Sequence, residues 1–240
     1  MTKRINIEFI FWIGGLIYLA FMNPSETHFS LCPIKNLGFS FCPGCGLGHS
    51  ISYLFHGQIQ ESFHHHPLGI FAMGVILNRI FQLIRNIFIL PPRLQDTKSK
   101  VLVTLIPSSL TLSVNLLTNK IMNTTIMMML SNLEIEESMF IQNLIKDMDE
   151  ERQKTFALMY QNKRRDTTLI LVTTIIGFFG FAGIQRFLTN QIGMGILYFF
   201  TGGLCFIGTI VDLVNHKSLV FEYNQKVALE TLEVIKGWGN

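Results

Sequence analysis

The sequence predicts an all-α membrane protein in which a soluble helical connector joins two transmembrane helical hairpins. Apolar residues make up 49% of the 240 residues and charged residues only 15%, against roughly 25% in soluble domains. Four apolar stretches are each close to the roughly 20 residues that cross the hydrocarbon core of a bilayer. The basic residues beside these stretches also fit one common side of the membrane. These three observations together favour four transmembrane spans.

The four expected spans pair into two hairpins, Ile5–Met22 with Leu68–Leu90 and Thr167–Phe187 with Ile192–Asn215. No small-residue cleavage pattern follows the first stretch, so we expect it to stay in the protein as an anchor. Basic residues gather at the ends that we assign to the cytoplasm: Lys3, Arg4, Arg93, Lys98, Lys100, Lys163, Arg164, Arg165 and Lys217. This bias predicts a multi-pass protein of the bacterial inner membrane with both termini in the cytoplasm.

Composition divides the chain into five segments. Residues 1–100 form a two-span hairpin with an external CPGCG loop, and residues 101–130 form a connector. Residues 131–166 form cytoplasmic amphipathic helices, 167–215 the second hairpin, and 216–240 a C-terminal amphipathic helix.

The connector stretch Val101–Asn119 has two open interpretations. It is moderately apolar but contains Pro107 and several serines. As a fifth span it would move the basic run at 163–165 to the outside and violate the charge rule. We therefore prefer a surface-associated connector.

Residues 131–165 have the pattern of two amphipathic helices. Apolar residues recur at helical spacing from Ile135 to Met148, and Asp149 is placed to cap a second helix, Glu150–Arg165. The acidic first turn and basic last turn of that helix suit its dipole. Glu222–Lys236 has a similar pattern and is expected to pack with these helices. Both a helical hairpin at the membrane surface and a partner-docking module fit this pattern.

The second hairpin is rich in glycine and has a charged residue near each end. It contains, in order, Gly177, Gly180, Gly183, Gln185-Arg186-Phe187, Gly193, Gly195, Thr201-Gly202-Gly203, Gly208 and Asp212-Leu213. This series resembles the TM-two domain family, over roughly residues 150–230. The resemblance implies two transmembrane helices with a short loop, an Arg-Phe pair at that loop and an Asp near the end of the second helix. Gln185 stands where the family usually has His or Asp.

Glycines allow membrane helices to approach each other closely. We expect Gly180 and Gly183 on one helix, and Gly195 and Gly202 on the other, to form the contact seam of this hairpin.

Arg186 and Asp212 are not expected to pair. A continuous helix of about 20 residues would separate them by about 30 Å, at opposite faces of the membrane. Asp212 would then lie level with Arg164 and Arg165, and we expect an ion pair there. Arg186 would lie at the outer loop and extend to the lipid headgroups.

The first hairpin also contains charged residues. Arg85 lies at a depth similar to that of Glu8, so we expect these two residues to pair. Arg79 lies near the middle of its span, where an arginine costs at least about 2.5–3.5 kcal/mol and needs a partner or water. Either that span is shorter than its apolar length, or Arg79 marks a binding pocket.

The loop at 23–66 carries a pattern typical of chemistry, Cys32-Pro33 followed by Cys42-Pro43-Gly44-Cys45-Gly46-Leu47. It resembles an uncharacterised family of small bacterial two-helix membrane proteins with a CPxCGL motif, over about residues 5–95. The resemblance implies a membrane location.

Three interpretations of these cysteines stay open. Zinc or another metal would be held by Cys32, Cys42, Cys45 and His49, since two residues separate Cys42 from Cys45 and His49 lies one helical turn further on. A reactive thiol pair at a helix N-terminus is the second interpretation. A disulfide, or reduced cysteines packed in a Pro/Gly turn, is the third. Cys205 lies in the middle of a span and is expected to pack.

The run His64-His65-His66 predicts a solvated stretch at the membrane interface, because adjacent helical residues point in different directions. Metal capture or a pH response is the alternative.

The function that we expect is non-catalytic: a membrane scaffold, assembly or regulatory subunit that acts through helix–helix association. The alternative is a metal-binding or thiol-redox protein that uses Cys32, Cys42 and Cys45, with zinc as the indicated cofactor. The expected partners are the lipid bilayer and other membrane helices, including those of a second copy. A net charge of +3 without an aromatic-interleaved basic patch excludes a nucleic-acid partner.

Overall fold

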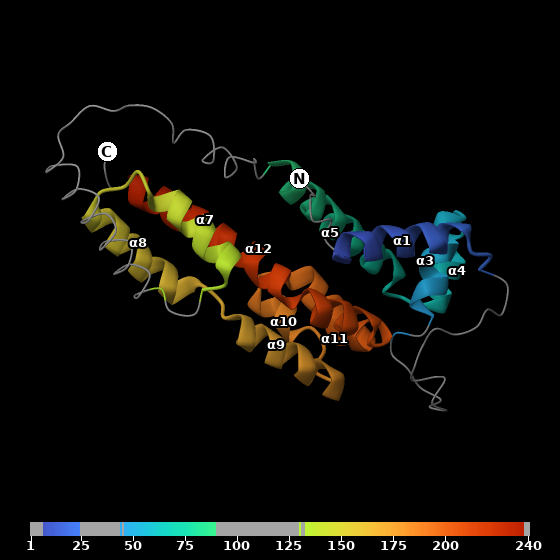
Figure 1. The fold of residues 1–240 in the computed structure, drawn as a ribbon. Coiled ribbons are helices and arrows are strands. Elements are labelled where there is room, and N and C mark those ends of the chain that lie inside the picture. Colours follow the sequence, from blue (N-terminus) through green and yellow to red (C-terminus); the bar gives the residue numbers. More distant parts are fainter. Residues whose placement is uncertain (1–6, 25–43, 45, 90–129, 131–132, 238–240) are drawn as a thin grey trace, which may run out of the picture. The chain divides into compact units, whose positions relative to one another are not determined.

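The computed structural model describes residues 7–24, 44, 46–89, 130 and 133–237. Every regular element in these residues is helical, as the sequence predicts (Figure 1). The chain divides into two compact units. The first unit combines residues 1–90 with 167–220, and the second combines 91–166 with 221–240.

The N-terminal part of the first unit consists of two longer helices and two short ones. These are α1 (Ile7–Phe21), α3 (Leu47–Phe55), α4 (Ile59–His65) and α5 (Gly69–Ile89). Helix α3 packs against α1, α4 and α5. Trp12, Ile51 and Ile76 lie in the apolar core that these helices share with Leu197 of a later helix.

The second part of this unit is a series of short or bent helices. It comprises α9 (Thr167–Ile176), the 3-10 turn η2 (Gly177–Phe179), α10 (Ile184–Leu188), α11 (Ile192–Cys205) and the first part of α12 (Ile207–Gly237). Helix α10 contacts both α9 and α11, and α11 contacts α5. The two halves of the first unit are therefore packed together.

Two of the four expected spans are not continuous helices. Gly180 (φ 99°) and Gly183 (φ 102°) interrupt the stretch from Thr167 to Phe187. Glycine adopts such positive φ angles without the steric cost that other residues have. In the part of the chain that the structure describes, no single helix is both long and apolar enough to cross a membrane. Two bent pairs meet these criteria when each pair is taken together: α4 with α5, at 99°, and α11 with α12, at 115°.

The bend between α11 and α12 is a left-handed turn. Gly202 to Phe206 all have positive φ angles, among them Leu204 at 55° and Phe206 at 68°. A left-handed conformation costs an ordinary L-residue roughly 1–2 kcal/mol. The turn therefore stores strain, which the packing around it must offset.

The second unit packs α7 (Ile135–Ile145) and α8 (Glu150–Lys163) with the C-terminal part of α12. The expected C-terminal helix at 222–236 is present but begins earlier, because α12 is continuous from Ile207 to Gly237. The core consists of buried apolar side chains from all three helices: Phe140, Ile141, Ile145, Phe156, Ala157, Tyr160, Val227, Ala228 and Ile235.

A buried carboxylate holds polar groups together inside this second unit. Glu137 accepts hydrogen bonds from the Tyr160 hydroxyl at 2.6 Å, from Arg164 Nε at 2.9 Å and from Asn224 Nδ2 at 3.2 Å. The Asn224 side chain also bonds the backbone N–H of Arg165 at 2.8 Å. Burial, together with the hydrogen bond to Glu137, raises the pKa of the Tyr160 phenol well above its usual range. The phenol therefore stays a donor.

We expect Tyr160→Phe to lower the free energy of unfolding of this unit by about 1.5–3 kcal/mol, the usual range for a hydrogen bond to a charged group. The raised pKa means that this contribution is fully present below about pH 10 and is lost as the pH rises further. Chemical denaturation monitored by circular dichroism measures both effects. Tyr223→Phe is the matched control, because it retains the ring that lies 5.8 Å from Arg165 Cζ. Equal effects of the two substitutions would contradict the prediction.

Candidate functional site

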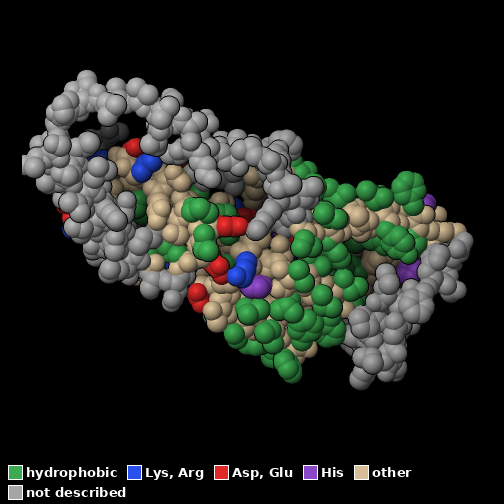
Figure 2. Space-filling view, in the orientation of Figure 1, with side chains coloured by type: hydrophobic (Ala, Val, Ile, Leu, Met, Phe, Trp, Pro, Cys, Tyr) green, Lys and Arg blue, Asp and Glu red, His purple; other side chains and the backbone are tan. Residues whose placement is uncertain are grey.

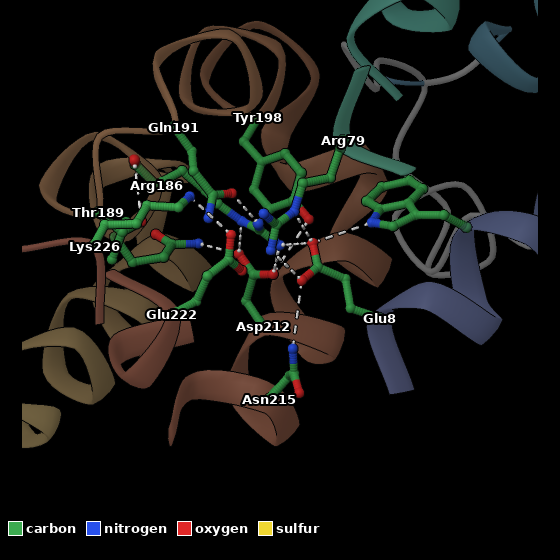
Figure 3. A network of polar contacts seen from close by, with 12 residues as sticks. Glu8, Arg79, Arg186, Thr189, Gln191, Tyr198, Asp212, Asn215, Glu222 and Lys226 are labelled. Carbon is green, nitrogen blue, oxygen red and sulfur yellow. Dashed lines mark hydrogen bonds and ion pairs between the residues drawn. The ribbon is translucent and has the colours of Figure 1, made fainter. Parts of the chain in front are cut away.

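Four charged side chains meet inside the first unit. Glu8 comes from α1, Arg79 from α5, Arg186 from α10 and Asp212 from α12, and each is at most 2% exposed. Figure 3 shows Arg186 between the carboxylates of Glu8 and Asp212. We call these four residues the charge quartet. Its two carboxylates balance its two guanidinium groups, which is the condition for keeping ionised groups buried.

Glu8 and Arg79 form the first pair of the charge quartet. Arg79 Nε lies 2.9 Å from Glu8 Oε1, and Arg79 Nη2 lies 2.7 Å from Glu8 Oε2. This two-point geometry is the strong form of an arginine–carboxylate contact. Trp12 Nε1 donates to Glu8 Oε1 at 3.2 Å and Asn215 Nδ2 approaches Oε2 at 3.4 Å, so both oxygens have several donors.

Arg186 and Asp212 form the second pair. Arg186 Nε donates to Asp212 Oδ2 at 2.8 Å, and Arg186 Nη2 contacts Asp212 Oδ1. The same Nη2 lies 2.9 Å from Glu8 Oε1, which links the two pairs. Gln185 Nε2 donates to Asp212 Oδ2 at 2.9 Å, and Arg186 Nη1 donates to Gln191 Oε1.

An aromatic ring completes the surroundings of Arg186. The Tyr198 ring centroid lies 5.4 Å from Arg186 Cζ, within the range of a cation–π contact. The Tyr198 hydroxyl approaches Asp212 Oδ1 at 3.5 Å. The charged groups of the quartet are thus satisfied by protein atoms on several sides.

Glycines allow the helices to approach closely enough for these contacts. A Cβ on Gly183 would lie 2.5 Å from the carbonyl oxygen of Gly195, so α10 and α11 touch through their backbones. A Cβ on Gly195 would lie 2.9 Å from the Phe187 ring. Of the other two glycines expected at the seam, Gly180 has open space around its Cβ position and Gly202 begins the left-handed turn.

The expectation that Arg186 and Asp212 lie at opposite membrane faces is wrong. It assumed a straight helix through Asp212, whereas the 115° bend after α11 returns Asp212 to Arg186. The expected pairing of Asp212 with Arg164 or Arg165 is also wrong, since the partner of Asp212 is Arg186 and Arg164 pairs with Glu137. The Gly202-Gly203 pair was the signal in the sequence that could have located this bend.

The expected pairing of Glu8 with Arg85 is wrong as well. Arg85 is exposed, whereas Glu8 pairs with Arg79 and Arg186. Arg79 was expected to need a partner or water, and it pairs with Glu8. In the sequence, the signal for this pair was the one acidic residue within the apolar N-terminal stretch, because a charge there needs a partner of opposite sign.

The expected metal or thiol site cannot be placed, since Cys32, Cys42 and Cys45 lie outside the described residues. His49, on α3, is half-buried, and its ring is stacked 6.1 Å from that of His65. Cys205 is buried, and a Cβ on Gly44 would lie 2.8 Å from its Sγ. No group of three metal-binding side chains occurs among the residues with described positions.

Sequence comparison supports both resemblances. A family model for the TM2 domain matches residues 161–214. A second model, described as a protein of unknown function (DUF2752), matches residues 32–80. Two TM2 domain-containing proteins of Dictyostelium discoideum are each 45% identical over 49 residues, or 20% of this chain. These residues span about a third of each relative, 32% and 36% of their lengths.

No solved structure matches this chain significantly. The TM2 match indicates a membrane protein, although its relatives come from Dictyostelium rather than from a bacterium.

The charge quartet draws on both matched regions. Arg186 and Asp212 lie in the TM2 match and Arg79 in the DUF2752 match, whereas Glu8 precedes both. The ion pairs therefore join two sequence regions that each resemble a separate family.

Proposed function

We propose that this protein is an integral membrane protein with a non-catalytic role as a scaffold, assembly or regulatory subunit. It acts through association of its helices with other helices in the bilayer. The observation that carries the proposal is the distribution of side chains in the first unit, where the charge quartet is buried and many large apolar side chains are exposed.

Exposed apolar residues occur on several helices of this unit. They include Ile10 and Ile17 on α1, Leu77 and Phe81 on α5, Val172 on α9, and Phe199 and Phe200 on α11. Figure 2 shows one face of the molecule, on which hydrophobic side chains form a broad surface. Water-exposed proteins rarely present such large apolar patches, whereas lipid tails solvate them. This distribution supports placement of the first unit in a bilayer.

The charge quartet supports a structural role for the buried polar groups. Each carboxylate accepts several hydrogen bonds from arginine and amide donors. Such a network fixes the relative positions of α1, α5, α10 and α12 because a displaced partner would leave an unpaired charge in an apolar interior. A rigid unit of this kind suits a scaffold.

We expect the protein to remain with the membrane pellet after an alkaline carbonate wash and to be released by detergent. Apolar contact with lipid tails survives high pH, whereas surface attachment through charges does not. Immunoblotting of the two fractions measures the result. Release by carbonate alone would contradict an integral location.

Association through helices can be tested at positions where the fold leaves room. A Cβ on Gly14 of α1 would meet no atom within 4 Å, and the same holds for Gly237 at the end of α12. We expect the protein mass held in each native nanodisc, after subtraction of lipid and belt polymer, to exceed the 27.4 kDa of one chain. Gly14→Leu should dissociate the assembly, because small residues allow membrane helices to approach closely. Gly237→Leu is the control. Particles holding one chain and no other protein would contradict the scaffold role.

The bilayer topology expected from charge bias, with both termini in the cytoplasm of a bacterium, stays a prediction. The alternative function, metal binding or thiol chemistry in the cysteine loop, also stays a prediction, because Cys32, Cys42 and Cys45 lie outside the described residues. Zinc analysis and thiol titration of protein purified without reductant distinguish the two functions. Stoichiometric zinc or a low-pKa thiol would favour the alternative.

A further inference from the structure

The short helix α4 turns sharply where the chain enters α5. The two helices meet at 99°. His66 ends α4 in an extended conformation, as expected for a residue that precedes proline. If α5 runs along the membrane normal, α4 lies nearly in the membrane plane.

Packing fixes this angle. Ser50 Oγ, on α3, lies 2.8 Å from both the hydroxyl and the carbonyl oxygen of Ser62, on α4. It also donates to the His66 carbonyl at 3.2 Å. A Cβ on Gly69, at the start of α5, would lie 1.8 Å from Ser50 Oγ. Helices α3, α4 and α5 therefore meet at a junction that has room only for glycine, which holds α4 across the end of α5.

Helix α4 has an apolar face that no other described helix covers. Ile59 and Phe63 are 61% and 60% exposed, and residues four apart lie on the same helix face. Ile70 and Phe71, in the first turn of α5, are exposed as well. Together these four side chains continue the apolar surface of α5 around the bend and onto α4.

The other sides of α4 are polar. Glu61 and His64 are exposed, while the His65 ring stacks at 4.8 Å on Tyr53 of α3. An apolar face opposite a polar one, on a helix perpendicular to a membrane-embedded helix, is the pattern of a helix in the interfacial plane.

We propose that α4 is an interfacial helix that lies in the headgroup region of the bilayer, with Ile59 and Phe63 inserted toward the acyl chains. The inference rests on the proposed integral membrane function and adds to it the depth at which the membrane surface meets the protein. We assign lipid as the contact of the apolar face of α4, because this face continues the apolar surface that α5 presents to the bilayer. Interfacial helices typically bury their apolar face about 5–10 Å into the headgroup boundary.

Quenching of tryptophan fluorescence by brominated lipids tests this placement. Full-length variants Phe63→Trp, Leu77→Trp and Glu61→Trp are reconstituted into phosphatidylcholine vesicles brominated at different acyl positions. The signal of the parent protein, which contains Trp12 and Trp238, is subtracted. Leu77 is an exposed residue of α5 that reports the hydrocarbon region, and Glu61 is the control on the polar side of α4.

We expect Trp fluorescence from Phe63→Trp to be quenched most by bromines nearest the headgroup, at least about twofold more than from Glu61→Trp. Leu77→Trp should be quenched most by bromines deeper in the chains. Quenching of Leu77→Trp without quenching of Phe63→Trp would overturn the inference but keep the integral membrane function, and would favour a protein partner on α4. Strongest quenching of Phe63→Trp by deep bromines would also overturn it. Absence of quenching in all three variants would overturn the integral membrane function itself.

Discussion

Asp212→Asn should destabilise the first unit by about 3–5 kcal/mol, the usual effect of removing one partner from a buried ion pair. The substitution replaces one oxygen by an NH2 group of similar size but removes a negative charge that Arg186 contacts at two points. Within the charge quartet, Glu8 would then be the one carboxylate facing two arginines, which leaves one positive charge of the quartet uncompensated. For a protein of this size the midpoint of thermal unfolding in detergent should fall by roughly 6–20 °C.

Glu61→Gln is the matched control for this substitution. It makes the same carboxylate-to-amide change in the same unit, but Glu61 is exposed, so its effect should stay within about 0.5 kcal/mol.

A double substitution sharpens the test. Asp212→Leu with Arg186→Met removes the second pair completely, leaving Glu8 paired with Arg79. We expect the double variant to be more stable than either single variant, since no unpaired charge remains. Additive losses would show that the pair does not act as a unit.

The sequence was sufficient to predict the helical class and the two family resemblances, because both depend on local features. Apolar stretches, charge clusters and the order of glycines can be read along the chain without knowledge of packing. Arg79 illustrates this approach: its position inside an apolar stretch predicted that it needs a partner or water, and Glu8 pairs with it.

The pairings within the charge quartet could not be predicted in the same way, because they depend on where helices end. A straight helix from Ile192 places Asp212 about 30 Å from Arg186. Five residues with positive φ reverse that result. Leu204 and Phe206 have no intrinsic preference for this conformation, so only the packing of the whole unit selects it. Gly202-Gly203 permitted a break, but the sequence did not distinguish a break from a close helix contact.

Gly203→Ala should destabilise the first unit by about 2–6 kcal/mol, because it acts at this bend in two ways. Gly203 has a φ of 66°, a conformation that costs an L-residue about 1–3 kcal/mol where it is strained. The added Cβ would also lie 2.1 Å from Thr209 Oγ1 and 3.3 Å from Ala182 Cβ. Overpacking of this kind typically costs a further 1–3 kcal/mol. The midpoint of thermal unfolding measures the sum, with Gly74→Ala as the control.

Gly74 lies within α5 with nothing within 4 Å of its Cβ position, so alanine there should be neutral or stabilising by up to about 1 kcal/mol. Thr209→Ala, combined with Gly203→Ala, removes the closest atom and should restore the steric part of the loss but not the backbone part.

The bend and the charge quartet should also be coupled, because the bend is what returns Asp212 to Arg186. Asp212→Asn should therefore cost less in the Gly203→Ala background than in the parent. An unchanged cost would mean that Asp212 reaches its partner without the left-handed turn.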